Sequence, residues 1–147
     1  MNKLALLAIA LIPFSAVAIA EDGFKCRAEG NQMELNACAA DEYAAADKEM
    51  NTVYRQILKE YADEPLFLGK LKIAQRLWVQ LRDAETEARF PVGSNENPRD
   101  VWGSAMPMDV DTYRAELTRQ RTKQLRVWID GLPDGDNLAG SVHKKKK

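Results

Sequence analysis

The sequence predicts an all-α fold, in which an antiparallel helical hairpin and a third helix form a small three-helix bundle. Three long stretches carry apolar residues at spacings of three, four and seven, which is the repeat of an α-helix that buries one face. Segments rich in proline, glycine and asparagine separate these stretches. No stretch of useful length alternates apolar and polar residues as a β-strand would, so helices packed on helices are the expected architecture.

The first helix is predicted over residues 36–61, where no proline interrupts the pattern. Just before it, Asn31 and Glu34 have the spacing of a capping box, which favours an early helical turn. The predicted buried face of this helix is Tyr43, Met50, Tyr54, Ile57 and Tyr61.

The segment Asp63-Glu64-Pro65 is expected to end the first helix and to begin the second, because proline suits the first turn of a helix. Phe90-Pro91 should end the second helix. A short connection between helices favours antiparallel neighbours, so these two helices are predicted to pair as a hairpin. The facing stripe of the second helix is Leu68, Leu71, Gln75, Trp78, Leu81 and Arg82.

The third helix follows an irregular stretch rich in proline, glycine, serine and asparagine. Asp109 or Asp111 is the predicted N-cap, because a carboxylate oxygen can accept hydrogen bonds from the free backbone N–H groups of a first turn. Gly131-Leu132-Pro133 is predicted to end the helix. Its apolar face is expected to hold Tyr113, Leu117, Gln120, Leu125 and Trp128.

Residues 1–20 have the layout of a cleavable bacterial signal peptide. Lys3 precedes an uncharged, mainly apolar run over residues 4–20, and Ala18 and Ala20 are the small residues that a signal peptidase requires. We therefore expect cleavage after Ala20 and a protein that works in the periplasm or outside the cell.

An uncleaved membrane anchor is the alternative, but the apolar run is short for a bilayer span and contains Pro13. The mature form is therefore predicted not to span a membrane. One helical domain is expected over residues 21–133. Residues 134–147 end in four lysines and are predicted to be a flexible basic tail.

Composition disfavours several classes of function. Residues 21–64 hold 11 acidic and 5 basic residues, which disfavours nucleic acid and favours a basic partner. The single histidine, His143, lies in the tail, and there is no phosphate-binding glycine loop. No cofactor, no metal and no enzymatic activity are therefore predicted.

Cys26 and Cys38 are the only cysteines, and both follow the signal peptide. An even number of cysteines in an oxidising compartment predicts one disulfide, which would add about 3 kcal/mol of stability. A catalytic thiol or a metal site is the alternative, but the partner residues for either are missing.

Several polar residues fall within the apolar stripes. In an antiparallel hairpin that sets Met50 near Trp78, Asp47 comes close to Arg82, and we predict that these two residues form an ion pair. Asn51, Gln75 and Thr118 are predicted to belong to a buried hydrogen-bond network. A salt bridge that sets helix register is the preferred interpretation of Asp47, and a ligand-binding or catalytic carboxylate is the alternative.

Four segments together resemble the LprI family of bacterial exported proteins. They are Gln32-Met33-Glu34-Leu35-Asn36-Ala37-Cys38-Ala39 with Cys26 before it, Asp47-Lys48-Glu49-Met50-Asn51-Thr52-Val53-Tyr54, Gln75-Arg76-Leu77-Trp78 with Arg82-Asp83-Ala84, and Leu117-Thr118 with Arg121. The resemblance spans roughly residues 26–128. It implies a helical periplasmic or surface domain, in a family named for a member that inhibits lysozyme.

The chain departs from that family pattern at one pair of positions. Many relatives carry a second cysteine pair where this chain has Thr86 and Tyr113. The resemblance therefore implies that the loop between the second and third helices is held less firmly here.

The leading functional hypothesis is an inhibitor of lysozyme-type glycosidases, by one of two routes. An acidic face could attract a basic lysozyme, or the loop over residues 93–99 could enter its cleft and satisfy the two catalytic carboxyl groups. In the loop, Ser94 would donate a hydrogen bond and Arg99 would form a bidentate ion pair. The alternative is that this segment is an ordinary solvated loop. The residues of the acidic face are Glu34, Asp41, Glu42 and Glu49.

A second hypothesis is a structural or interaction protein of the cell envelope. Arg114, Arg121 and the lysine tail would then contact peptidoglycan, lipid head groups or another exported protein. An ordinary solvated terminus is an equally simple interpretation of the tail.

Overall fold

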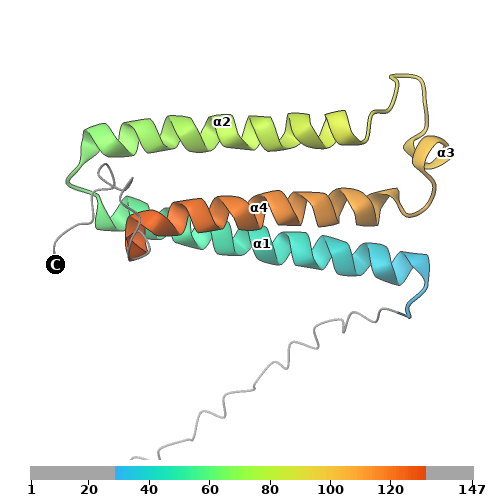
Figure 1. Cartoon of the computed structure of the whole chain (residues 1–147), viewed down its shortest axis with the longest axis horizontal. Helices are drawn as coiled ribbons and strands as arrows, with labels where there is room; N and C mark the ends of the chain where they lie inside the picture. Colours follow the sequence, from blue (N-terminus) through green and yellow to red (C-terminus); the bar gives the residue numbers. More distant parts are fainter. Residues whose placement is uncertain (1–28, 132–147) are drawn as a thin grey trace, which may run out of the picture.

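The computed structural model describes residues 29–131, which contain four helices and no strand, as the all-α prediction requires (Figure 1). Three helices are long: α1 spans Gln32–Glu60, α2 spans Pro65–Arg89 and α4 spans Met106–Asp130. The short helix α3, Pro98–Trp102, lies in the predicted irregular stretch and was not expected. The predicted signal peptide, the tail and Cys26 lie outside the described residues, so the disulfide stays a prediction; Cys38 is buried in α1.

Helix α1 begins with the capping box that the sequence indicates. The Asn31 side chain accepts from the Glu34 backbone N–H at 3.1 Å, and the Asn31 backbone N–H donates to the Glu34 carboxylate at 2.9 Å. These two bonds satisfy donors that have no partner within the helix, so α1 begins at Gln32, four residues earlier than predicted from the apolar pattern.

The predicted boundaries of α2 are confirmed. Pro65 is its first residue, and the helix ends at Arg89, immediately before Phe90-Pro91. Helix α4 also ends where expected, at Gly131, whose φ of 83° is open to glycine and strained for other residues.

Two residues of the predicted buried stripes are wrong. Leu81 on α2 is 55% exposed and Gln120 on α4 is exposed, because each lies at the edge of its stripe and turns toward solvent.

The predicted N-cap of α4 is wrong. The helix begins at Met106 with Ala105 in the cap position, ahead of Asp109 and Asp111. Pro107 in the first turn and Gly103, with a φ of 78°, are the local signals for this earlier start. Asp109 still lies in the first turn, where its charge favours the helix dipole without capping it.

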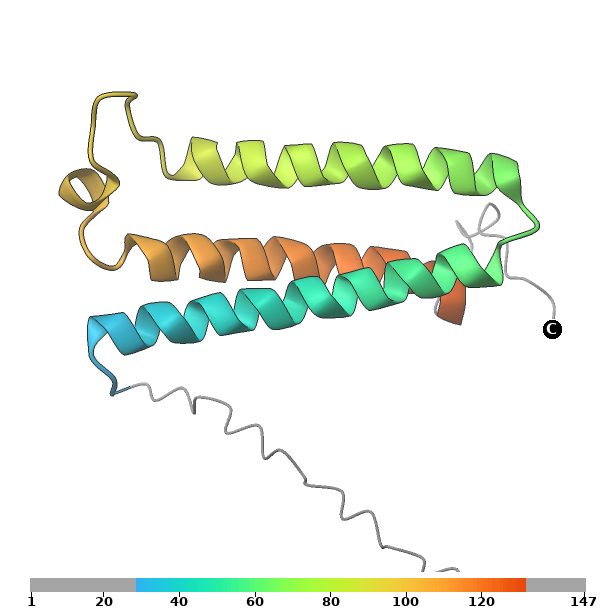
Figure 2. The ribbon, with the colours of Figure 1, turned by 180° about the vertical axis from the view of Figure 1, so that it is seen from behind.

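Helices α1 and α4 form the closest pair, and they run parallel (Figures 1 and 2). Two ion pairs join them with the same sequence offset of 77 residues: Glu42 to Arg119 at 3.2 Å and Glu49 to Arg126 at 2.7 Å. A constant offset between paired positions is the mark of two parallel helices in register. Helix α2 runs antiparallel to both, as predicted for the hairpin, but its backbone lies farther from α1 than that of α4 does.

Side-chain size explains why α1 packs on α4. The buried faces of these helices carry small residues, including Ala39 and Ala46 on α1 and Ala115 on α4, which let two backbones approach closely. Helix α2 instead contacts its neighbours through long side chains, so its axis lies farther away. The main core cluster lies toward the C-terminal end of α1 and consists of Met50, Val53, Ile57, Tyr61, Leu71 and Leu125.

Aromatic rings close this end of the bundle. The Phe67 ring centroid lies 4.8 Å from that of Tyr61 and 4.7 Å from that of Trp128, so one side chain of α2 packs between α1 and α4. The buried Tyr61 hydroxyl donates to the Trp128 backbone carbonyl at 2.8 Å. These contacts close the end of the bundle that lies opposite to the loop between α2 and α4.

Candidate functional site

Arg82 forms a polar cluster with α1 and with its own helix. Its Nη1 lies 3.8 Å from Asp47 Oδ1, and its Nε and Nη2 donate to Asp83 Oδ1 at 2.9 and 2.8 Å. Asn51 donates to the other Asp47 carboxylate oxygen at 2.7 Å. The structure thus brings Asp47, Asn51 and Arg82 together, although the shorter ion pair of Arg82 is with Asp83.

The same guanidinium is held by two aromatic rings. Its Cζ lies 5.3 Å from the Trp78 ring centroid and 5.7 Å from that of Tyr43, within the range of cation–π attraction. The Arg82 side chain is only 9% exposed, so its charge is balanced mainly inside the protein. This arrangement fits a contact that orients α2 on α1, since the carboxylates are occupied by Arg82 and Asn51.

Gln75 belongs to a different polar contact, which includes an arginine that sequence reasoning placed elsewhere. Gln75 Oε1 accepts from Arg121 Nε at 2.9 Å, and Gln75 Nε2 donates to Met50 Sδ at 3.5 Å. Arg121 also lies over the Trp78 ring, 5.8 Å from its centroid, and burial lowers the pKa of Arg121 while Tyr54 opposes that change. Arg121 therefore links α4 to α2. Its spacing of four residues from Leu117 and from Leu125 is the signal that could have placed it on this face.

The prediction that Thr118 joins a buried hydrogen-bond network is wrong for the part of the chain that the structure describes. Thr118 is fully buried, and its Oγ1 has no hydrogen-bond partner among these residues. One turn later, the buried Thr122 Oγ1 donates to the Thr118 backbone carbonyl at 2.9 Å. Thr118 lies in the buried face of the closely packed α4, where its small side chain fits but its hydroxyl makes no hydrogen bond.

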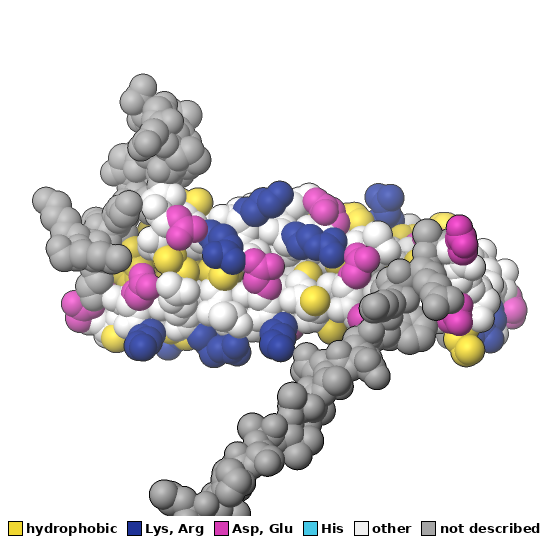
Figure 3. Space-filling view, turned by 90° about the horizontal axis from the view of Figure 1, so that it is seen from below, with side chains coloured by type: hydrophobic (Ala, Val, Ile, Leu, Met, Phe, Trp, Pro, Cys, Tyr) yellow, Lys and Arg dark blue, Asp and Glu magenta, His cyan; other side chains and the backbone are white. Residues whose placement is uncertain are grey.

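The residues of the predicted acidic face lie along α1, but most of their charges already have partners. Glu34 belongs to the capping box, Glu42 pairs with Arg119, and Glu49 pairs with Arg126. Asp41 is exposed. Figure 3, which views the molecule from the side of α1, shows basic and acidic side chains interspersed, so this face presents no continuous acidic field where grey atoms leave it visible.

The loop between α2 and α4 carries the other two predicted binding residues, Ser94 and Arg99, and both are exposed. Hydrogen bonds within the loop define its shape: the Gly93 N–H donates to Glu96 Oε2 at 2.7 Å, and Asn97 accepts from the Arg99 N–H at 3.0 Å as the cap of α3. Among residues 29–131, neither the Ser94 hydroxyl nor the Arg99 guanidinium has a hydrogen-bond or ion-pair partner.

Aromatic side chains anchor this loop to the end of the bundle. Trp102 Nε1 donates to the Pro91 carbonyl at 3.0 Å, which closes the loop across 11 residues. The Phe90 ring packs edge-on against Trp102 at 5.8 Å and against Tyr113 at 6.3 Å. Tyr113, where the family resemblance implies a cysteine in relatives, thus helps to join the end of α2 to α4.

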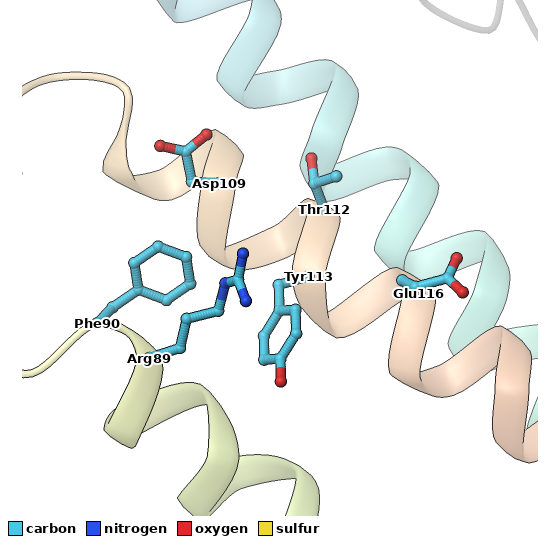
Figure 4. Close-up of a pocket in the computed structure, with 6 residues that line it drawn as sticks. All are labelled: Arg89, Phe90, Asp109, Thr112, Tyr113 and Glu116. Atoms are coloured by element: carbon cyan, nitrogen blue, oxygen red, sulfur yellow. The ribbon is translucent and has the colours of Figure 1, made fainter.

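An open cavity of about 400 Å³ lies beside this anchor, between the end of α2 and the first turns of α4 (Figure 4). The Arg89 guanidinium carbon lies 4.6 Å from the Tyr113 ring centroid and 5.9 Å from that of Phe90. The sequence did not predict this cavity. The local sequence signal for it is the cation Arg89 next to the aromatic Phe90 at the end of α2. It is lined by Arg89, Phe90, Asp109, Thr112, Tyr113 and Glu116.

Two further findings concern the described residues alone. Between residues 29 and 131, no group of three histidine, cysteine, aspartate or glutamate side chains is placed to hold a metal ion. In the same range, each helix is either too short or too polar to cross a bilayer.

The fold and the site define a small helical protein whose buried polar side chains are mostly paired internally, with an anchored loop and an open cavity at one end. The chain belongs to the LprI lysozyme inhibitor family, which matches residues 25–125. It is also 38% identical to an uncharacterized protein of Rhizobium meliloti (strain 1021), over 71% of this chain and 78% of that protein. No solved structure matches this chain.

Proposed function

We propose that this chain is an exported inhibitor of lysozyme-type glycosidases and that it acts through the loop between α2 and α4. The observation that carries the proposal is the match to the LprI lysozyme inhibitor family over residues 25–125, which includes this loop. The target would be a protein, and the inhibitor itself would perform no chemistry.

The loop has the chemistry that a glycosidase cleft calls for. Enzymes of this class work with two carboxyl groups that flank the scissile bond. Arg99 offers a planar guanidinium that can bind a carboxylate through two hydrogen bonds, and Ser94 offers a hydroxyl donor. Both side chains are exposed, so neither has to break a contact within the described residues before it binds.

The anchoring of the loop lowers the entropic cost of binding. The Trp102 hydrogen bond to Pro91 and the edge-on contact of Phe90 with Trp102 already restrict the loop before it meets a target. A loop that is ordered in the free protein loses less conformational freedom on binding. The loop projects from the end of the bundle, where the bodies of the long helices do not obstruct a partner (Figures 1 and 2).

The acidic face of α1 receives a smaller role in this proposal. Glu42 and Glu49 are paired with arginines of α4, so they contribute little net charge at short range. Asp41 and its neighbours would speed the encounter with a basic lysozyme and add little to the affinity of the complex.

The test is inhibition of a lysozyme by the purified exported chain, measured as the rate of clearing of a peptidoglycan suspension. Arg99→Ala is expected to weaken inhibition by at least about tenfold, because it leaves a buried carboxylate of the target without its partner. Arg55→Ala is the matched control, since Arg55 is an exposed arginine of α1 far along the sequence from the loop. Undiminished inhibition by Arg99→Ala would remove the loop from the proposal, and no inhibition by the unaltered chain would remove the function.

A further inference from the structure

The outer face of α2 carries an apolar stripe that no part of the described chain covers. Leu66 is 78% exposed, Ile73 46%, and Leu77 and Leu81 55% each. Their spacings of seven, four and four place them on one side of the helix. The buried side of α2, with Leu71, Gln75, Arg82 and Thr86, lies on the opposite side.

Two small residues extend this stripe toward the end of the helix. Ala84 and Ala88 are exposed and follow Leu81 at spacings of three and four. We call Leu66, Ile73, Leu77, Leu81, Ala84 and Ala88 the α2 stripe. A row of exposed aliphatic side chains along one helix is typical of a surface that meets another protein. Figures 1 and 2 show α2 at one edge of the bundle, where a partner can reach it.

The charges beside the α2 stripe are divided between the two halves of the helix. Residues 65–77 contain Lys70, Lys72 and Arg76 and no acidic residue. Residues 78–89 contain Asp83, Glu85 and Glu87. The first half of α2 is therefore basic at its surface, and the second half holds the acidic residues.

The two arginines of the second half do not cancel this division. Arg82 is buried against Asp47 and Asp83, and Arg89 lies over the Tyr113 ring of α4. Both cations are therefore directed toward their own protein. Glu85 and Glu87 are exposed, without a hydrogen-bond or ion-pair partner among residues 29–131.

We infer that the α2 stripe is a dimer interface that binds the same stripe of a second copy of this chain, in antiparallel orientation. A partner that fits must be apolar along its middle, acidic opposite the start of α2 and basic opposite its end. A second α2 that runs in the reverse direction has this pattern. A parallel second copy would instead set like charges opposite one another.

The register follows from the sequence positions. With the two-fold axis at Leu77, this leucine meets its own counterpart, and Ile73 lies beside Leu81 of the second copy. The same axis places Lys70 beside Ala84 of the second copy and within one turn of its Glu85. The resulting contact is isologous, so each favourable pair occurs twice. This inference does not rest on lysozyme inhibition, because the loop lies outside the stripe.

The test is the mass of the purified exported chain in solution, measured by sedimentation velocity over a range of concentrations. We expect a monomer–dimer equilibrium, and Leu77→Lys should raise the dimer dissociation constant at least tenfold by placing two like charges on the axis. Met33→Lys is the matched control, because Met33 is 76% exposed on α1 and lies outside the stripe. Circular dichroism of each variant establishes that the helices remain folded.

Charge reversal tests the antiparallel orientation. Lys70→Glu and Glu85→Lys should each weaken the dimer, and the double variant should restore it, because the two positions meet across the interface. A monomer at all concentrations would overturn the inference, as would a dimer that Leu77→Lys leaves intact. Binding of the monomer to phosphatidylglycerol vesicles through Leu77 would also overturn it and would assign the stripe to a lipid surface.

Discussion

Two buried threonines of α4 allow a matched experiment on an unpaired hydroxyl group. Thr118 and Thr122 lie one turn apart and are 0% and 4% exposed. The Thr122 hydroxyl donates to the Thr118 carbonyl at 2.9 Å, whereas the Thr118 hydroxyl has no partner within residues 29–131. Valine has the same shape as threonine and a similar helix propensity, so Thr→Val changes chiefly the hydroxyl.

The expected effects of the two substitutions have opposite signs. A buried polar group without a partner costs roughly 1–3 kcal/mol, so Thr118→Val should raise the free energy of unfolding by about 1 kcal/mol. For a domain of this size, that gain corresponds to a Tm about 4 °C higher. Thr122→Val removes a hydrogen bond and should lower the free energy of unfolding by about 0.5–1 kcal/mol.

The assay is urea unfolding of the wild-type chain and both variants, followed by far-ultraviolet circular dichroism. Equal m-values in the three proteins would establish that the midpoints report stability alone. A Thr118→Val protein that is no more stable than the wild type would contradict the reasoning, because it would mean that the Thr118 hydroxyl is satisfied in solution.

Two further predictions concern α1 and α4. Asn31→Ala removes the side-chain acceptor of the capping box and should lower the free energy of unfolding by about 1 kcal/mol, while Asn31→Asp, which keeps an acceptor, should change it much less. Burial raises the pKa of Asp111 above its ordinary value of 3.8, partly offset by Arg114, so the stability that Asp111 contributes is complete at low pH and is lost as pH rises through the raised pKa. Asp111→Asn should therefore raise Tm at about pH 7 and leave it unchanged at about pH 3; an equal gain at both pH values would exclude this linkage.

The helix ends that could be predicted depend on contacts within four residues. Asn31 and Glu34 cap α1, Pro65 begins α2, and Gly131 ends α4, and each effect involves only neighbouring backbone groups. The start of α4 was misplaced because an aspartate can serve as a cap or as a first-turn residue, and the pattern alone does not distinguish these roles. Pro107 was the stronger signal.

The polar contacts were predicted where two positions on adjacent helices could be compared. Setting Met50 near Trp78 led to the proximity of Asp47 and Arg82, which the structure has. Arg121 was missed because its partner, Gln75, comes from α2, and the spacing of residues along a helix does not give the distance between α2 and α4. The cavity beside Arg89 was missed for the same reason, since its walls come from two helices and a loop.

By itself, the sequence determined that this chain forms long helices, where most of them begin and end, and most of the residues that each buries, because these properties follow from backbone sterics and periodicity over a few residues. Only the tertiary structure decided that α1 packs most closely on α4, in parallel, and that α2 keeps an exposed stripe. Three apolar helical faces can pair in several ways with similar burial of area. The choice among them depends on how side chains of different sizes fit together in three dimensions.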